Sequence, residues 1–155
     1  MKPGYDEIVQ WMRDYFATYN SYAQDAQTVH HMDEYFSSDL TFIPYMHVFG
    51  GPDNAITSRQ EFYDMLTGHP EDYEKFVVED IFVDAERMVS VAFLQATIYE
   101  TATDEVKVQK HYLPLYELVL DDEGSLKIKT IRFFWEASPP EVDAGYSVDD
   151  SKWSK

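Results

Sequence analysis

The chain has 155 residues, 45% of them hydrophobic and 26% charged, which is typical of one folded domain. Its formal net charge of −17 disfavours nucleic acid and anionic membrane surfaces as partners, because both bind clustered Lys and Arg. The absence of Cys excludes disulfides and thiol chemistry, and the start MKPGYDEIVQWM lacks a signal-type hydrophobic region, so we expect a soluble, cytoplasmic protein.

The N-terminal part of the chain predicts two helices and a strand. Apolar residues recur at intervals of three and four from Tyr5 to Ala23, which is typical of an amphipathic helix. A shorter helix is expected from about Asp25 to Phe36. The stretch 40–49 is rich in strand formers, but Pro44 cannot donate to a ladder, so we expect an edge or a bend there.

A third helix and a long meander follow. Ser58 and Glu61 have the spacing of a capping box, and Gly68 is a typical helix end. Strands are expected over about 75–84, 87–102, 106–120 and 125–137, and turns as short as those between them make successive strands antiparallel. These elements predict an α+β domain over residues 1–137, with three helices on one face of a cone-shaped, curved antiparallel sheet. We interpret the acidic stretch 138–155 as a C-terminal arm that could be disordered.

Three segments carry a resemblance to a known superfamily. RDYFATYN, EYFSSDLTFIPY and HYLPLYELVLDDEGSLKIKTIRFFWE resemble the first helix, the second helix with strand one, and the final hairpin of the nuclear transport factor 2-like superfamily, in its SnoaL-like and ketosteroid-isomerase-like branch. The resemblance runs from Tyr5 to Ser138 and implies a cystatin-like fold with a pocket inside the cone and a homodimer. It identifies a fold better than a reaction, because this fold serves isomerases, cyclases, dehydratases and non-enzymatic binders.

The resemblance also implies candidate site residues. Tyr15 corresponds to the tyrosine that ketosteroid isomerases use in an oxyanion hole, whereas their two carboxylates correspond to Ile43 or Pro44 and to Tyr116. Alternation in the strand 106–120 puts Tyr112 and Tyr116 on the face that the resemblance turns toward the pocket. Their hydroxyls could donate to a ligand carbonyl, or the rings could simply fill the core.

Four other positions have two interpretations each. His47 lies near the place where the isomerase branch keeps its base and could exchange protons near neutral pH, but it could equally be an exposed strand end. Arg132 could bind an anionic group of a ligand or pair with one of the many carboxylates. His30 and Glu34 could share an ion, but a solvated ion pair is more common.

Trp135 is expected beside the ligand. One predicted face of the last strand contains Lys127, Lys129, Ile131, Phe133 and Trp135, and its aromatic end could line the cone or cover the outer sheet against a second copy.

These residues predict a pocket protein for a hydrophobic small molecule. No phosphate-cradle, nucleophile-triad or zinc motif is present, so we expect no cofactor and no metal. The chemistry would be proton transfer, such as isomerisation, cyclisation or dehydration, with Tyr15 and Tyr116 as donors and His47 as the base. The missing carboxylates favour the alternative of a binding or interaction domain without catalysis.

Overall fold

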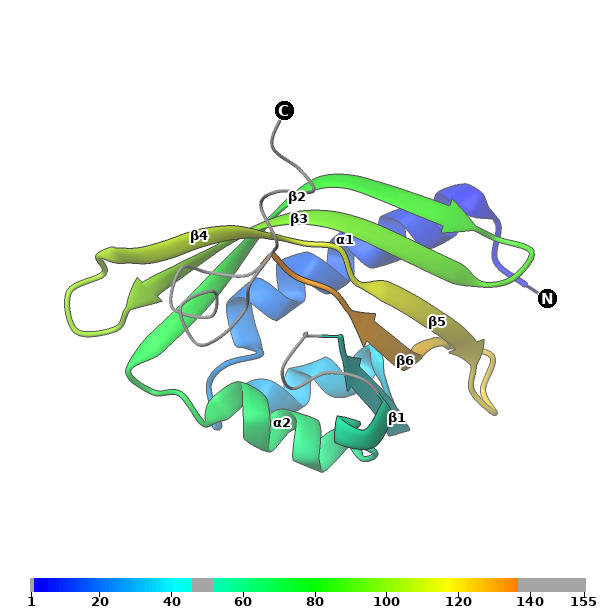
Figure 1. Ribbon diagram of the computed structural model, residues 1–155. Helices are drawn as coiled ribbons and strands as arrows, with labels where there is room; N and C mark the ends of the chain where they lie inside the picture. The colour runs from blue at the N-terminus through cyan, green and yellow to red at the C-terminus, as the bar shows by residue number, and fades with distance from the viewer. Residues whose placement is uncertain (1, 46–51, 137–155) are drawn as a thin grey trace.

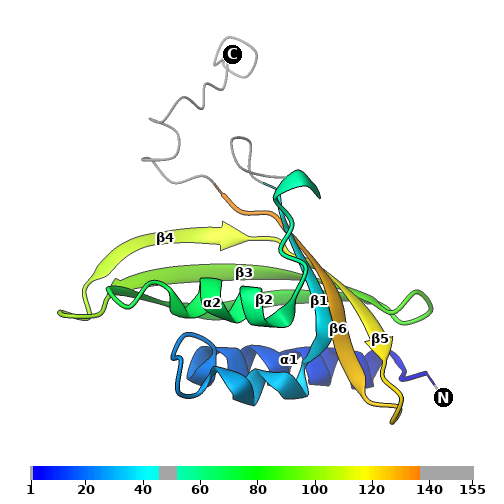
Figure 2. The ribbon, with the colours of Figure 1, turned by 90° about the horizontal axis from the view of Figure 1, so that it is seen from below.

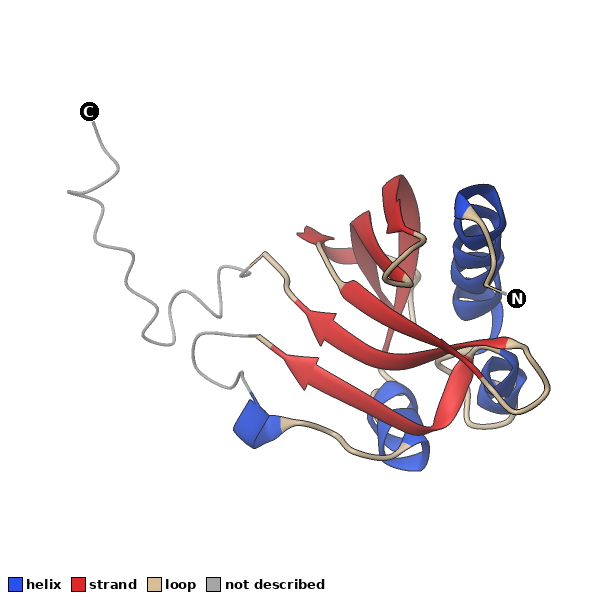
Figure 3. Cartoon of the chain, turned by 90° about the vertical axis from the view of Figure 1, so that its right-hand side faces the viewer, coloured by secondary structure: helices blue, strands red, loops and turns tan. Residues whose placement is uncertain are grey.

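The structure is a computed structural model that describes residues 2–45 and 52–136. It contains the helices α1 (Tyr5–Tyr22) and α2 (Arg59–Thr67) and the 3-10 helices η1 (Val29–Glu34) and η2 (Pro52–Asn54). The strands are β1 (Phe36–Pro44), β2 (Asp72–Asp84), β3 (Val89–Glu100), β4 (Val106–Tyr112), β5 (Leu115–Leu120) and β6 (Leu126–Phe133). The helices lie on one face of a curved sheet (Figures 1 and 3), which confirms the predicted α+β class. Within the described residues, no helix is both long and apolar enough to cross a membrane.

The sheet divides into two wings that share β3. Its strand order is β1-β6-β5-β3-β2, and β4 pairs with β3 beside this path. The start of β3, Val89–Val91, pairs with β5, whereas its later part pairs with β4 (Figure 2). β1 and β6 are parallel, whereas the pairs β2–β3, β3–β4, β3–β5 and β5–β6 are antiparallel. The division leaves a concave space between the wings and the helices.

The predicted single strand over 106–120 is wrong in one respect, because the chain breaks into β4 and β5. Pro114 lies fully buried at the break and has no N–H to donate to a ladder. Its carbonyl instead accepts a hydrogen bond from the Ala92 N–H at 3.2 Å. At this break the chain stops pairing with the later part of β3 and begins to pair with its start.

The predicted second helix is also shorter than expected. The turn before η1 is held by the Asp25 carboxylate, which accepts from the Gln27 N–H at 2.8 Å. Such a side chain competes with helical hydrogen bonding and favours a turn. Phe36 already belongs to β1, where it pairs with Ile128 of β6.

The last strand contains a bulge that changes which side chains face inward. Glu117 pairs with Thr130 but the next residue, Leu118, pairs with Ile128, so Lys129 is the extra residue. Ile128 and Ile131 are consequently both buried. The predicted common face from Lys127 to Trp135 is therefore wrong, because its members are divided between two environments. Lys127 and Lys129 donate to backbone carbonyls of η1 and β1, whereas Phe133 and Trp135 line a cavity.

Candidate functional site

A cavity of about 680 Å³ opens between α1, α2 and the concave face of the sheet. This volume is within the range of small-molecule sites in proteins. Its apolar lining consists of Phe42, Pro44, Ile56, Phe62, Met65, Leu66, Phe76, Ile98, Ile131, Phe133 and Trp135. Its polar lining consists of Tyr15, Tyr19, Gln24, Asn54, His69, Asp72, Tyr73, Glu74, Lys110, Tyr112 and Tyr116.

Helix α2 forms one wall of the cavity. Its start is the predicted one, because the Ser58 hydroxyl accepts from the Glu61 N–H at 3.2 Å and so caps the helix. The apolar residues Phe62, Met65 and Leu66 then recur at helical spacing and face the cavity. Phe62 is buried against Phe42 of β1, with ring centroids 5.0 Å apart.

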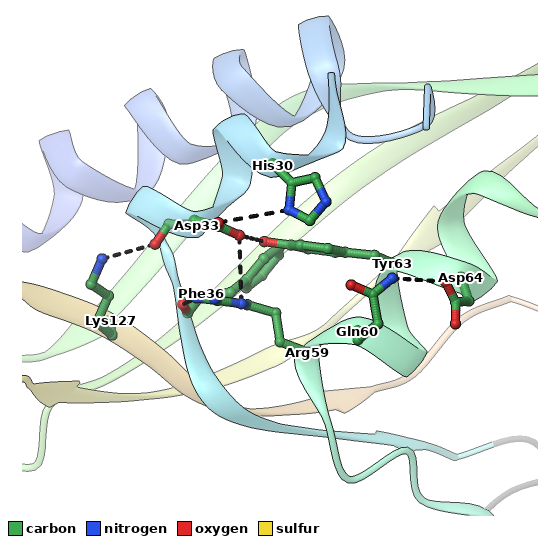
Figure 4. A network of polar contacts seen from close by, with 8 residues as sticks. All are labelled: His30, Asp33, Phe36, Arg59, Gln60, Tyr63, Asp64 and Lys127. Atoms are coloured by element: carbon green, nitrogen blue, oxygen red, sulfur yellow. Dashed lines mark hydrogen bonds and ion pairs between the residues drawn. The ribbon is translucent and has the colours of Figure 1, made fainter. Parts of the chain in front are cut away.

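A polar network around Asp33 holds this wall to the rest of the molecule (Figure 4). The buried Tyr63 of α2 donates its hydroxyl to the Asp33 carboxylate of η1 at 2.6 Å. Arg59, one turn earlier, lies 3.5 Å from the same carboxylate and donates to the Phe36 carbonyl at 3.0 Å. Burial, with the hydrogen bond to Asp33, raises the pKa of Tyr63 well above its usual value, so this hydroxyl remains a donor.

Three buried tyrosines form the inner end of the cavity. Tyr15 and Tyr19 lie four residues apart on α1, and Tyr116 reaches them from β5. The Tyr15 and Tyr116 rings pack edge to face, with their centroids 5.6 Å apart. Burial raises the pKa of all three phenols well above the usual value. They are therefore neutral hydrogen-bond donors over the physiological range.

Glu74 of β2 is the carboxyl group whose environment is most unusual in this cavity. Its side chain is partly buried, and burial raises its pKa above the ordinary value of 4.5. The Tyr112 hydroxyl donates to it, and the charge of Lys110 also acts on it; both effects oppose the rise in pKa. A carboxyl with a raised pKa beside an apolar cavity can exchange protons closer to neutral pH than an exposed one.

The position of Glu74 is fixed by two amide side chains, Asn20 of α1 and Gln24 of the turn that follows α1. β2 is an edge strand, and these two amides bond its free backbone groups. Gln24 donates to the Glu74 carbonyl and accepts from the Glu74 N–H, both at 2.7 Å. Asn20 does the same for Phe76, both at 2.9 Å. These side chains replace a neighbouring strand and prevent the edge from moving away from α1.

Sequence reasoning missed Glu74 and Lys110. The predicted strand began at residue 75, so Glu74 was left outside it. The usable signal was alternation, because Glu74 is two residues before Phe76, which is buried on the inner face of β2. Lys110 is likewise two residues before Tyr112, so the two side chains share one face of β4, and both line the cavity.

The predicted site residues are placed differently from one another. Tyr15, Tyr112, Tyr116 and Trp135 line the cavity. Arg132 does not: its Nε donates to the Glu117 carboxylate at 3.1 Å and its guanidinium to the Tyr45 hydroxyl at 2.7 Å, which is the second of its two interpretations. His47 and the predicted arm 138–155 lie outside the described residues.

Two further histidines lie beside carboxylates. His30 lies 3.7 Å from the Asp33 carboxylate. His69 lines the cavity but is largely exposed beside Glu71, 3.9 Å away. Over residues 2–45 and 52–136, no three His, Asp or Glu side chains are grouped so that they could hold a metal ion.

Solved structures of low sequence identity share this arrangement. An NTF2-like protein from Anabaena variabilis superposes with a TM-score of 0.63 at 12% identity, over 89% of this chain and 96% of its own. AclR, a candidate hydroxylase from Streptomyces galilaeus, gives 0.63 at 15% identity, over 94% of this chain and 85% of its own. A candidate SnoaL-like polyketide cyclase from Mesorhizobium loti gives 0.55 at 16% identity, over 82% and 97%.

The chain therefore has the nuclear transport factor 2-like fold, as the resemblance predicted. No protein-family model matches the sequence, and no curated protein matches it significantly. Likeness at this level of identity establishes the fold and leaves the reaction to be argued from the site.

Proposed function

We propose that the chain binds a small hydrophobic molecule in the cavity and moves a proton on it through Glu74. The observation that carries this proposal is the partly buried Glu74 carboxyl, which lines a mainly apolar cavity, accepts a hydrogen bond from the Tyr112 hydroxyl and has a raised pKa. The apolar lining suits a ring system, and tyrosine hydroxyls suit a carbonyl oxygen. The candidate SnoaL-like polyketide cyclase among proteins of this fold supports chemistry of the same kind.

In the proposed reaction, Glu74 acts as base and then as acid. Its carboxylate takes a proton from the carbon next to a ligand carbonyl, and the electron pair of that C–H bond moves into an enolate. Where the ligand has a C=C bond next to that carbon, the enolate is conjugated, and return of the proton at the far end of this system completes an isomerisation. Attack of the enolate on a second carbonyl would instead form a C–C bond and an alkoxide, which takes the proton back from Glu74 to complete a cyclisation. Neutral tyrosine hydroxyls, of which Tyr15 and Tyr116 are the predicted donors, would stabilise the enolate oxygen. A role of His47 as a second base stays a prediction.

Exchange of carbon-bound hydrogen tests this proposal without knowledge of the natural substrate. Cyclic ketones such as 2-tetralone and 1-indanone are incubated with the protein in D₂O, and loss of the α-proton signal is followed by ¹H NMR. We expect the wild-type protein to accelerate exchange of at least one ketone. Glu74→Gln should lower that rate about 10²- to 10⁴-fold, which is the usual contribution of a general acid or base.

The matched control is Glu79→Gln, which removes a carboxyl from the same strand outside the cavity lining. It should exchange the ketone at the wild-type rate. Equal rates for wild type and Glu74→Gln would contradict the proposal, as would a library in which no ketone exchanges faster than in buffer.

A ligand-binding role without catalysis is the second candidate. It is favoured by one observation: the positions that correspond to the two carboxylates of the isomerases hold Ile43 or Pro44 and Tyr116, none of which carries a carboxylate. Under this alternative, a ketone would bind without accelerated exchange, and Tyr15→Phe would change its affinity and leave the exchange rate at the buffer value.

A further inference from the structure

Glu74 and Tyr112 come from the two strands that flank β3, and their side chains meet over it. Glu74 of β2 is opposite Ile98 of β3, whereas Tyr112 of β4 is opposite Leu94. Ala96 lies between these two β3 positions on the same face, and its small side chain leaves room for the two longer ones to cross. The Tyr112 hydroxyl donates to Oε2 of the Glu74 carboxyl across this gap.

Both partners of this hydrogen bond are held in place by their own neighbours. The Tyr112 ring packs against Phe76 and Phe133, with ring centroids 5.6 and 4.8 Å apart. The backbone of Glu74 is held by Gln24, which bonds both its N–H and its carbonyl. The contact is therefore preorganised, because neither residue has to be ordered when a ligand binds.

The two oxygens of the Glu74 carboxyl have different surroundings. Oε2 accepts from the Tyr112 hydroxyl, whereas over residues 2–45 and 52–136 no group donates to Oε1. Because Glu74 lines the cavity, Oε1 is the oxygen that is left for a ligand. A base that takes a proton from carbon needs one such oxygen.

The same hydrogen bond acts on the ionisation of Glu74. Burial raises the pKa of this carboxyl, and the hydroxyl that donates to it and the charge of Lys110 oppose the rise. The Lys110 charge also acts on Glu136, so it is shared between two carboxylates. From the other elements, Tyr19 of α1 and Tyr116 of β5 face Glu74 as neutral phenols, because burial raises the pKa of both. A hydroxyl donates more strongly to an ionised carboxyl than to a neutral one, so the contact favours the base form.

We propose that Tyr112 is a positioning residue that binds Oε2 of Glu74, so that Oε1 of an ionised carboxyl is turned toward the ligand. The Tyr112 hydroxyl then serves Glu74 rather than a ligand carbonyl, which leaves Tyr15 and Tyr116 as the predicted donors to the ligand. This inference rests on the proposed use of Glu74 as the base.

Titration of the Glu74 carboxyl tests this role without a substrate. The ¹³C signal of the carboxyl, assigned with Glu74→Gln, is followed by NMR across pH in wild type, Tyr112→Phe and Tyr99→Phe. Tyr112→Phe keeps the ring and loses only the donor, so the midpoint should rise by about one pH unit, as expected for one hydrogen bond to a charged group. Tyr99→Phe removes a hydroxyl of β3 outside the cavity lining and should keep the wild-type midpoint.

The pH dependence of ketone exchange tests the consequence for the reaction. The exchange rate should rise with pH as Glu74 ionises, and Tyr112→Phe should move the midpoint of this rise upward by the same amount. At pH values below both midpoints, its rate relative to its own plateau should be about tenfold lower than that of wild type. The ketone concentration that gives half-maximal exchange should stay unchanged, because the hydroxyl does not contact the ligand.

The outcomes separate this inference from the proposed reaction. An unshifted Glu74 midpoint in Tyr112→Phe would overturn the inference, and ketone exchange by wild type could still stand. An unshifted pH dependence of exchange would overturn it as well, and so would a higher half-maximal ketone concentration, which would indicate direct contact with the ligand. A raised midpoint without exchange of any ketone would support the hold of Tyr112 on Glu74 and contradict the proposed reaction alone.

Discussion

At the scale of single residues, the properties of the cavity depend on how the Glu74 carboxyl is held. Burial favours its neutral form, whereas the Tyr112 hydroxyl and the charge of Lys110 favour its ionised form. Burial is the larger effect, so the pKa of Glu74 is raised. At a given pH, its protonated form is therefore more populated than that of an exposed glutamate. A group in that balance can both accept and return a proton.

The raised pKa of Glu74 makes a prediction about stability and pH. The folded state holds this proton more tightly than the unfolded state, whose carboxyl has the ordinary pKa of 4.5. The resulting stabilisation is complete below pH 4.5 and is lost as the pH rises through the folded-state pKa. Glu74→Gln should therefore gain free energy of unfolding relative to wild type between about pH 4 and about pH 8, measured by urea denaturation. Stability of Glu74→Gln that falls relative to wild type over this range would contradict the assignment.

Part of this site could be predicted from sequence. Tyr15, Tyr112, Tyr116 and Trp135 were placed near the pocket by resemblance and alternation, and all four line the cavity. Glu74 and Lys110 could not be combined in advance, because their meeting depends on the register of both neighbours of β3. The sequence allowed Arg132 either to bind a ligand anion or to pair with a carboxylate. Which of the two occurs depends on the group that lies near it in the folded chain.

At the scale of elements, side-chain amides of α1 and of the turn after it hold the edge of the sheet. Gln24→Ala would leave the N–H and carbonyl of Glu74 without these partners in a partly buried place, so we expect a loss of about 1–3 kcal/mol in the free energy of unfolding. Asn20→Ala should cost a similar amount. Gln10→Ala, which removes only an exposed contact to Asp14, should leave stability nearly unchanged. Losses as small for Gln24 as for Gln10 would contradict the edge-holding role.

The attachment of α2 gives a second test at this scale. Tyr63→Phe removes a buried hydroxyl that donates to the Asp33 carboxylate, and we expect it to lower the free energy of unfolding by about 1.5–3 kcal/mol. Tyr73→Phe is the matched control, because its hydroxyl donates to Asp104 at 2.7 Å in an exposed place. Its effect should be under about 1 kcal/mol. Similar losses in thermal and urea unfolding for both variants would argue against the role of the Asp33 network.

The elements that sequence predicted well are those with local signals. The period of α1, the capping residue of α2 and the polar turns of the meander are each decided within a few residues. The bulge at Lys129 and the break before β5 were missed, because each is visible only in the register with which strands pair. Phe133 and Trp135 line the cavity, which is one of the two alternatives that the sequence left open, and this removes one motive for an exposed interface.

At the scale of the whole molecule, we still predict a homodimer formed through the outer face of the sheet. This face exposes Val77 and Phe82 of β2 and Val119 of β5, although Phe133 and Trp135 no longer belong to it. Sedimentation at micromolar concentration should give the mass of two chains, and Phe82→Glu should shift it toward one. Tyr5→Glu, an exposed residue of α1, should not. A wild-type monomer would contradict the prediction.

The most direct test of the whole account is the titration of the Glu74 carboxyl itself. Protein labelled with ¹³C at the glutamate side-chain carboxyl is followed by NMR across pH, and Glu74→Gln identifies the resonance. We predict a midpoint above the ordinary value of 4.5. A midpoint at or below 4.5 would mean that Glu74 is fully ionised at neutral pH, and it would contradict the proposed reaction.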